Sequence, residues 1–263
     1  MNDHAPQIDT FVVDDHEALG AATGHIAALD LYSGSVVRPS LRALSDKIDE
    51  LQKSDDARAE FELLDYEPMY QSTVEGYLLA VQSMWERGLR GLLINRAKRL
   101  SKGAGYVTLL QRATWSDVKK PDLHGYFEEL IGLPLMSFYS HADLDLLQLL
   151  GSALRHGNGQ AARKLHERCP SLWVHWLTPG TRIEAGTFRF EVPADAPKHP
   201  DFELITLSSA VLDQMIQSVV WFWEDIEFIR CNSFKHKHET VVATLRQQVF
   251  EWPNRPAKRV WSP

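Results

Sequence analysis

The sequence has little cysteine and no long hydrophobic run. Its 263 residues include two cysteines, Cys169 and Cys231, which are too far apart to form a closely spaced cysteine motif. A disulfide framework and a thiolate zinc site are therefore not expected. The start of the chain, Met1 to His4, lacks the positive charge and apolar core of a secretory signal, and no segment approaches the ~18 apolar residues of a membrane helix. We expect a cytoplasmic protein with no membrane partner.

Positive charge is also scarce. The chain has 28 Lys and Arg residues against 35 Asp and Glu residues, which gives a formal net charge of −7. A protein of this charge does not bind nucleic acid through bulk electrostatic attraction. Any RNA site must therefore be a local basic patch.

The motifs of most large enzyme classes are missing. The sequence has no Walker-type phosphate loop, no dinucleotide-binding glycine fingerprint, no Gly-x-Ser-x-Gly nucleophile elbow and no His-Glu-x-x-His zinc motif. The run from Asp14 to Glu17 is rich in metal-binding side chains, but consecutive loop residues rarely converge on one ion. We predict that the chain uses neither a metal nor an organic cofactor.

Hydrophobic residues, 44% of the chain, recur mostly at three- and four-residue spacing, which is typical of amphipathic helices. Ser72 with Glu75, and Ser140 with Asp143, have the spacing of capping boxes that open helices. The predicted helices cover about 41–51, 72–100, 123–133, 144–154, 161–168 and 209–229. Between 180 and 206 the residues alternate at period two and prolines interrupt. We predict a mainly α multi-helix bundle with long central helices and a small extended or hairpin excursion near 180–206.

The pattern divides the chain into three parts. Residues 1–38 show no sustained period, and we interpret them as a loosely attached N-terminal extension. Residues 39–250 form the helical domain. Residues 251–263 are a basic tail with proline and tryptophan, in which Trp252 and Trp261 either anchor the tail on the domain or contact a partner.

Arg155 and His156 end one strongly apolar predicted helix, and Gly157, Asn158 and Gly159 follow. In a functional site, the guanidinium would hold a phosphate or a developing oxyanion, and the imidazole would transfer a proton near neutral pH. Alternatively, the two side chains only pair with the last carbonyl groups of the helix, and the glycines reverse the chain.

A second cluster follows the last long helix. Five residues separate Arg230 from His236, so the two side chains converge only if the helix ends between them. Lys235, Lys237 and His238 complete the densest positive charge in the chain. This segment is either a phosphate-binding site or a solvated basic loop.

The helical pattern together with arginine and histidine at helix ends resembles the HEPN superfamily of small helical bundles. The family motif is an arginine, usually followed by a polar residue, with a histidine four to six residues further on. Arg230 and His236 have this spacing, although Cys231 occupies the polar position. Arg155-His156 matches only the beginning of the motif, so the motif is split in this chain.

The resemblance implies a metal-independent ribonuclease of bacterial defence or toxin–antitoxin systems, with a composite site across a homodimer and an antitoxin or other protein partner. The catalytic pair would be Arg230 with His236, or Arg155 with His156. The histidine would help the ribose 2′-hydroxyl attack the adjacent phosphate, and the arginine would stabilise the developing charge. Substrate would be bound by Asn158, Lys235, Lys237 and His238.

Two other functions remain open. The first is a noncatalytic helical module that binds a protein partner or RNA through the edge from Arg155 to Asn158. The second is a binder of a small molecule or nucleotide between the long helices. The ribonuclease hypothesis is favoured if the arginine and histidine side chains line a shared cleft.

Overall fold

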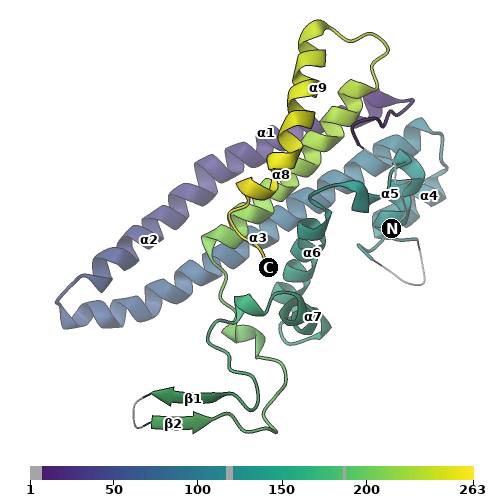
Figure 1. Ribbon diagram of the computed structural model, residues 1–263. Coiled ribbons are helices and arrows are strands. Elements are labelled where there is room, and N and C mark those ends of the chain that lie inside the picture. The colour runs from purple at the N-terminus through teal and green to yellow at the C-terminus, as the bar shows by residue number, and fades with distance from the viewer. Residues whose placement is uncertain (1–7, 117–120, 186–187) are drawn as a thin grey trace.

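The computed structural model describes residues 8–116, 121–185 and 188–263, and it confirms a mainly α multi-helix bundle (Figure 1). The helices are α1 (Ala22–Tyr32), α2 (Arg38–Gln52), α3 (Ala57–Arg99), α4 (Ala104–Arg112), α5 (Leu123–Ile131), α6 (His141–His156), α7 (Gln160–Arg168), α8 (Ser209–Asn232) and α9 (Glu239–Glu251). The strands are β1 (Arg182–Ala185) and β2 (Phe188–Glu191). Among the described residues, no helix is both long enough and hydrophobic enough to cross a bilayer.

Helix α3 is the longest element, and it begins earlier than the sequence predicts. The side chain of Asp56 caps it by accepting a hydrogen bond from the Arg58 amide at 2.9 Å, so the capping box predicted at Ser72 and Glu75 is wrong. The 43 residues of α3 span ~64 Å at 1.5 Å per residue. The periodicity before Ser72 was missed because Pro68 lies inside the helix and several apolar side chains there face outward.

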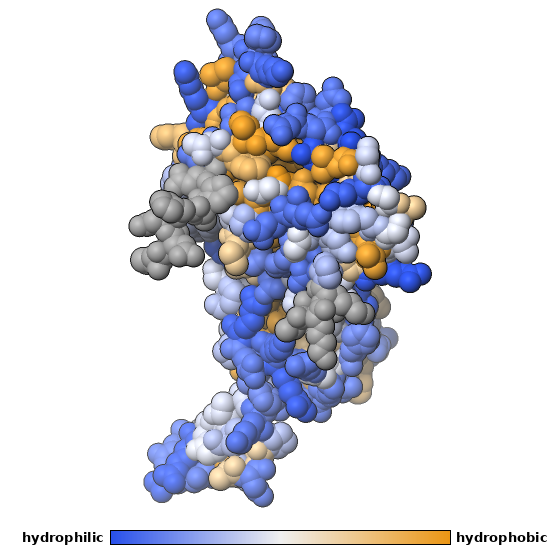
Figure 2. Space-filling model, turned by 90° about the vertical axis from the view of Figure 1, so that its right-hand side faces the viewer, coloured by the Kyte–Doolittle hydropathy of each residue, from blue (hydrophilic) through white to orange (hydrophobic). Residues whose placement is uncertain are grey.

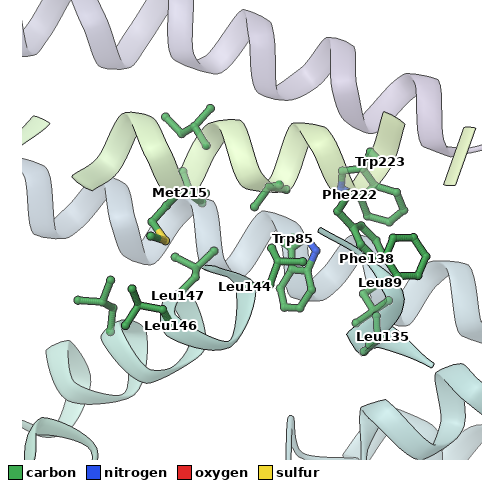
Figure 3. Packing of buried hydrophobic residues seen from close by; sticks show 14 of the residues in the cluster. Trp85, Leu89, Leu135, Phe138, Leu144, Leu146, Leu147, Met215, Phe222 and Trp223 are labelled. Atoms are coloured by element: carbon green, nitrogen blue, oxygen red, sulfur yellow. The ribbon is translucent and has the colours of Figure 1, made fainter. Parts of the chain in front are cut away.

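The core lies where α3, α6 and α8 pack together (Figure 3). Helices α3 and α8 run in the same direction, because Gln71 contacts the Leu207 amide at one end and Trp85 contacts Phe222 further along. Trp85, Phe222 and Trp223 are almost fully buried. These bulky aromatic side chains supply much of the apolar area that holds the bundle together.

Helix α1 joins the core at a glycine of α3. His25 of α1 stacks on Trp223 of α8 with ring centroids 4.3 Å apart. A Cβ at Gly88 would lie 2.8 Å from the Trp223 ring and 3.0 Å from the His25 ring, so only glycine lets the three helices approach this closely.

The described part of the predicted N-terminal extension, residues 8–38, packs into the bundle and is not loosely attached. Leu19, Ala22 and Val37 are buried. The Asp15 carboxylate forms an ion pair with the buried Arg96 guanidinium at 3.3 Å. Arg99 also pairs with Asp15. No single period marks these residues, because a 3-10 turn, α1 and a π turn at Ser33–Val37 each place a short apolar piece on the core.

The predicted excursion near 180–206 is a small antiparallel hairpin. Strand β1 pairs with β2 so that Arg182 lies opposite Glu191. The hairpin projects from the bundle as a small lobe at the lower end of Figures 1 and 2. Figure 2 also shows mostly hydrophilic surface between this lobe and a hydrophobic patch in the upper half of that face.

Two arginines dock the C-terminal tail onto buried carboxylates. Arg255 pairs with Asp225 of α8 at 2.8 Å, and Arg259 forms a bidentate pair with Asp143 of α6, with both distances 2.8 Å. Asp225 and Asp143 are 1% and 3% exposed. Asp143 therefore does not form the predicted capping box, and the Ser140 side chain caps nothing. Trp252 packs against Phe228, with ring centroids 4.8 Å apart.

We expect Arg259→Ala to lower the free energy of unfolding by about 3 kcal/mol or more, because it leaves the Asp143 carboxylate buried without its cation. Urea denaturation of the wild type and the variant measures this loss. The matched control is Arg246→Ala on the exposed side of α9, which should change the free energy by no more than about 0.5 kcal/mol. Equal effects of the two substitutions would contradict the role given to Arg259.

Candidate functional site

An open groove of about 880 Å³ lies between α3, α6, α7 and the segment that follows α4. Arg155 and His156, at the end of α6, both line it, as the first sequence motif requires. The other charged and polar residues of the groove include Glu86, Arg90, Arg112, Trp115, Asp145, Gln148, Gln160, Lys164, Glu167 and Arg168.

Among the described residues that line the groove, five are cations and three are carboxylates (Glu86, Asp145 and Glu167), so the groove carries an excess of positive charge. Arg90 is neutralised by Glu86 at 2.6 Å, and Arg168 by Asp145 at 2.5 Å. Three further cations, Arg112, Arg155 and Lys164, have no ion pair with a carboxylate in the part of the chain that the structure describes. In a chain of net charge −7, this is a local basic patch of the kind that an anionic ligand requires.

One buried amide holds the Arg155 guanidinium, and a second buried amide holds the first. Arg155 donates to Gln82 Oε1 at 2.8 Å, and Gln82 Nε2 donates to Gln148 Oε1 at 2.7 Å. Gln82 and Gln148 are 1% and 9% exposed. Within the described residues, Gln148 Nε2 has no hydrogen-bond partner although it is buried beside the groove. The series therefore ends on a buried donor that has no partner among the described residues.

Gly151 makes room for this series of amides. A Cβ on Gly151 would lie 2.2 Å from Gln82 Oε1, which is far inside van der Waals contact. Any side chain at position 151 must therefore displace the amide that holds Arg155.

A sharp turn brings the N-terminus of α7 to the same groove. Gly157 has a φ of 61°, a left-handed value that favours glycine, and Gly159 precedes α7 without a capping side chain. Gln160 and Lys164 then line the groove. The first amides of a helix lack partners within the helix and attract anions, so this helix end adds to the charge of Arg155.

Asn158, predicted to bind substrate, has a structural contact instead. Its side-chain amide donates to Asp201 and accepts from the Phe202 amide at 2.7 Å. These bonds tie the turn between α6 and α7 to the segment before α8.

The second sequence motif lies at the end of α8, and its arginine is already paired. Arg230 donates to Glu227 at 2.7 Å and lies over the Phe234 ring at 5.1 Å. The hydrogen bond to Glu227 raises the pKa of Arg230, so the guanidinium stays charged but is neutralised by its neighbour. Burial and the nearby Glu227 carboxylate raise the pKa of Cys231 to about 11, which keeps the thiol protonated at neutral pH.

The basic residues after Arg230 form the connection from α8 to α9. Lys235 and His236 are exposed. Lys237 donates to the Phe234 carbonyl at 3.0 Å, and His238 caps α9 by accepting from the Thr240 amide at 3.3 Å. Neither a hydrogen bond nor a ring contact joins Arg230 to His236 among the described residues.

The two motifs do not share a cleft within one chain. Arg155 lies at the level of Gln82 on α3, whereas the end of α8 lies beside Phe11 and Val13, near the level of Arg96. Fourteen residues of α3 separate these two levels, which is ~21 Å along the helix.

One cluster beside the groove was not predicted from the sequence. Trp115 donates to Asp145 Oδ1 at 2.8 Å, and its ring contacts His124 at 4.2 Å between centroids. His141 lies 5.3 Å from His124. Burial lowers the pKa of both histidines, and each has an unpaired, buried Nε2 within the described residues. The three rings come from separate segments, so no sequence spacing relates them.

No group of three or more His, Cys, Asp or Glu side chains among the described residues has a geometry that could hold a metal ion. Compared with protein-family models, with curated proteins and with solved structures, the chain shows no match. The chemistry of the groove is therefore inferred from its own residues.

We expect His124 and His141 to make the protein less stable as the pH falls. Both pKa values are below 6.5 in the folded state, so the unfolded chain binds more protons as the pH drops through about 6.5, and folding loses free energy. The charged groups that face the pair are Asp122, Asp145 and Arg168. Urea denaturation at pH 7.5 and pH 5.5 should show a smaller loss for His124→Gln/His141→Gln than for the wild type. An identical loss in both proteins would count against this origin.

The Gly151→Ala substitution should lower the free energy of unfolding by about 1–3 kcal/mol, because the new methyl group must displace Gln82. The matched control is Gly76→Ala in α3, where nothing lies within 4 Å of the added Cβ. That substitution should raise the free energy by up to about 1 kcal/mol, since alanine favours the helix. Urea denaturation of both variants tests whether the two free energies of unfolding change in opposite directions. A Gly151→Ala variant that is more stable than the wild type would exclude the close contact between residue 151 and Gln82.

Proposed function

We propose that the chain binds RNA by its phosphate groups in the groove at the end of α6. The observation that carries this proposal is that Arg112, Arg155 and Lys164 line one groove together with the N-terminus of α7, and that none of the three is paired with a carboxylate among the described residues. Phosphate contacts of this kind supply affinity without reading a base sequence.

Arg155 is the centre of the proposed site. Gln82 uses one guanidinium donor and so fixes the direction of the side chain, which leaves its other donors for a phosphate. Lys164 and the first amides of α7 would contact the same or the next phosphate. A fixed guanidinium loses less conformational entropy on binding than a mobile one.

Metal-independent ribonuclease activity is a second candidate, and the exposed His156 beside Arg155 in the groove favours it. His156 would accept the proton of a ribose 2′-hydroxyl as that oxygen attacks the adjacent phosphorus. The bond from phosphorus to the 5′-oxygen of the next nucleotide would break, this oxygen would take a proton from water, and Arg155 would stabilise the charge on the phosphate oxygens. The products would be a 2′,3′-cyclic phosphate and a 5′-hydroxyl.

The remaining implications of the resemblance stay predictions. A homodimer would place the Arg230 and His236 pair of a second copy near a composite site, and an antitoxin or other protein partner would control it. A role in bacterial defence and a cytoplasmic location belong to the same prediction.

We expect Arg155→Ala and Lys164→Ala each to weaken the binding of a fluorescent single-stranded RNA by tenfold or more. Each lost phosphate contact should also reduce the slope of log affinity against log salt concentration by about 0.7. Fluorescence anisotropy at several salt concentrations measures both quantities. Lys235→Ala is the matched control, because this exposed lysine lies in the other motif and should leave the affinity unchanged.

The same proteins distinguish binding from cleavage. Incubation with RNA in EDTA should give cyclic phosphate ends if the second candidate holds, and His156→Ala should then lose cleavage while it keeps RNA affinity. If the RNA is bound but stays intact, the protein is a noncatalytic RNA-binding module. A protein that binds RNA equally well with Arg155→Ala and Lys164→Ala would contradict the groove as the site.

A further inference from the structure

The first part of α3 has two opposite apolar sides, and only one of them is covered. Ala59 and Val74 are buried, and Leu63, Tyr66 and Tyr70 are half-buried, on the side that packs against α2. On the other side, Phe61 is 71% exposed and Leu64 is 70% exposed. Two large apolar side chains that lie next to each other on one side of a helix are rarely left exposed to solvent. Such an apolar patch is typical of a binding site.

The uncovered side has the spacing of a coiled-coil seam. Ala57, Phe61, Leu64 and Pro68 follow one another at intervals of four, three and four residues, and all four are exposed. These are the a and d positions of a heptad pattern. We call them the α3 seam. It covers about three helical turns, or ~17 Å, so a helix of roughly twelve residues would match it.

Acidic side chains flank the α3 seam on both sides. Glu60 and Glu67 occupy g positions, and Asp65 occupies an e position, and all three are exposed without an ion pair among the described residues. The one basic flanking residue, Arg58, is held by Asp56 at 3.0 Å. In coiled coils, the charges at e and g select the partner and its orientation.

This charge pattern argues against a second copy of the chain as the occupant. Two α3 seams packed in parallel would place Glu60 against Asp65 of the second copy, and antiparallel packing would place Glu60 against Glu67, while Arg58 is already paired with Asp56. Like charges at e and g positions repel. A helix with apolar a and d positions and Lys or Arg at its flanking positions would instead bury the seam and pair the acids.

We propose that the α3 seam binds a cationic amphipathic helix of a partner protein, which packs as a third helix beside α2 and α3. Helices α2 and α3 project together from the bundle at the lower left of Figure 1, so a partner helix has access along the seam. The proposal is independent of the RNA groove, because Pro68 and Gln82 are fourteen residues apart on α3, or ~21 Å.

Two synthetic 21-residue helical peptides test this proposal with the full-length chain. Both carry Leu at the a and d positions; one has Lys at e and g, and the other has Glu. We expect the Lys peptide to bind at least tenfold more tightly than the Glu peptide in fluorescence anisotropy. Phe61→Ser/Leu64→Ser, which keeps every charge, should weaken binding of the Lys peptide by tenfold or more. Phe250→Ser is the control, because Phe250 is equally exposed, at 73%, on α9.

A charge-reversed variant distinguishes specific binding at the α3 seam from unspecific attraction of a cationic peptide to an acidic protein. Glu60→Lys/Asp65→Lys/Glu67→Lys should invert the preference, so that the Glu peptide binds more tightly than the Lys peptide. Circular dichroism checks that each variant stays helical. The proposal is overturned if Phe61→Ser/Leu64→Ser leaves the affinity unchanged or if the variant with reversed charges keeps the original preference. It is also overturned if the wild type sediments as a dimer that these seam substitutions dissociate, since the occupant would then be a second copy.

Discussion

The close contact of three helices at Gly88 is the constraint on which the rest of the bundle depends. Without a side chain at this position, Trp223 and His25 stack directly over the backbone of α3. This contact makes α1 part of the core and fixes α8 beside α3. Phe138, in the turn before α6, then packs its ring against Phe222, and Leu147 of α6 lies further along the same hydrophobic core, near Met215 (Figure 3).

Helix α3 changes its role along its length. Near Phe61 it supports α2 and leaves a seam uncovered; near Gln82 it holds the arginine of the groove; near Arg96 it binds the N-terminal segment through Asp15. A single rigid helix therefore sets the distances between surfaces of different chemistry. A partner on the α3 seam and an anion in the groove would be held apart by a fixed length of helix.

Much of the fold could be predicted from local signals, and the missed parts depend on long-range contacts. Gly132 ends α5 in the left-handed conformation, and α8 begins at Ser209, both as the sequence indicates. The capping signal at Ser72 was wrong, because a helix already passes through this residue. The signal at Ser140 marked the start of α6 correctly, but the sequence could not show that Asp143 pairs with Arg259 far along the chain. The sequence could place Arg155 and His156 together at a helix end, whereas Gln82, Gln148 and Trp115 come near them only through the tertiary fold.

The pair between Asp143 and Arg259 has a consequence for the order in which the protein is made. The ribosome adds Asp143 to the chain 116 residues before its cation. At about 5–20 residues per second, roughly 6–23 s of translation separate the two side chains. During that interval, packing α6 on α8 would bury the Asp143 carboxylate with hydrogen bonds from Gln214 and Ser218 of α8 but without its cation. The packing of α6 on α8 therefore gains its full stabilisation only after the tail has emerged.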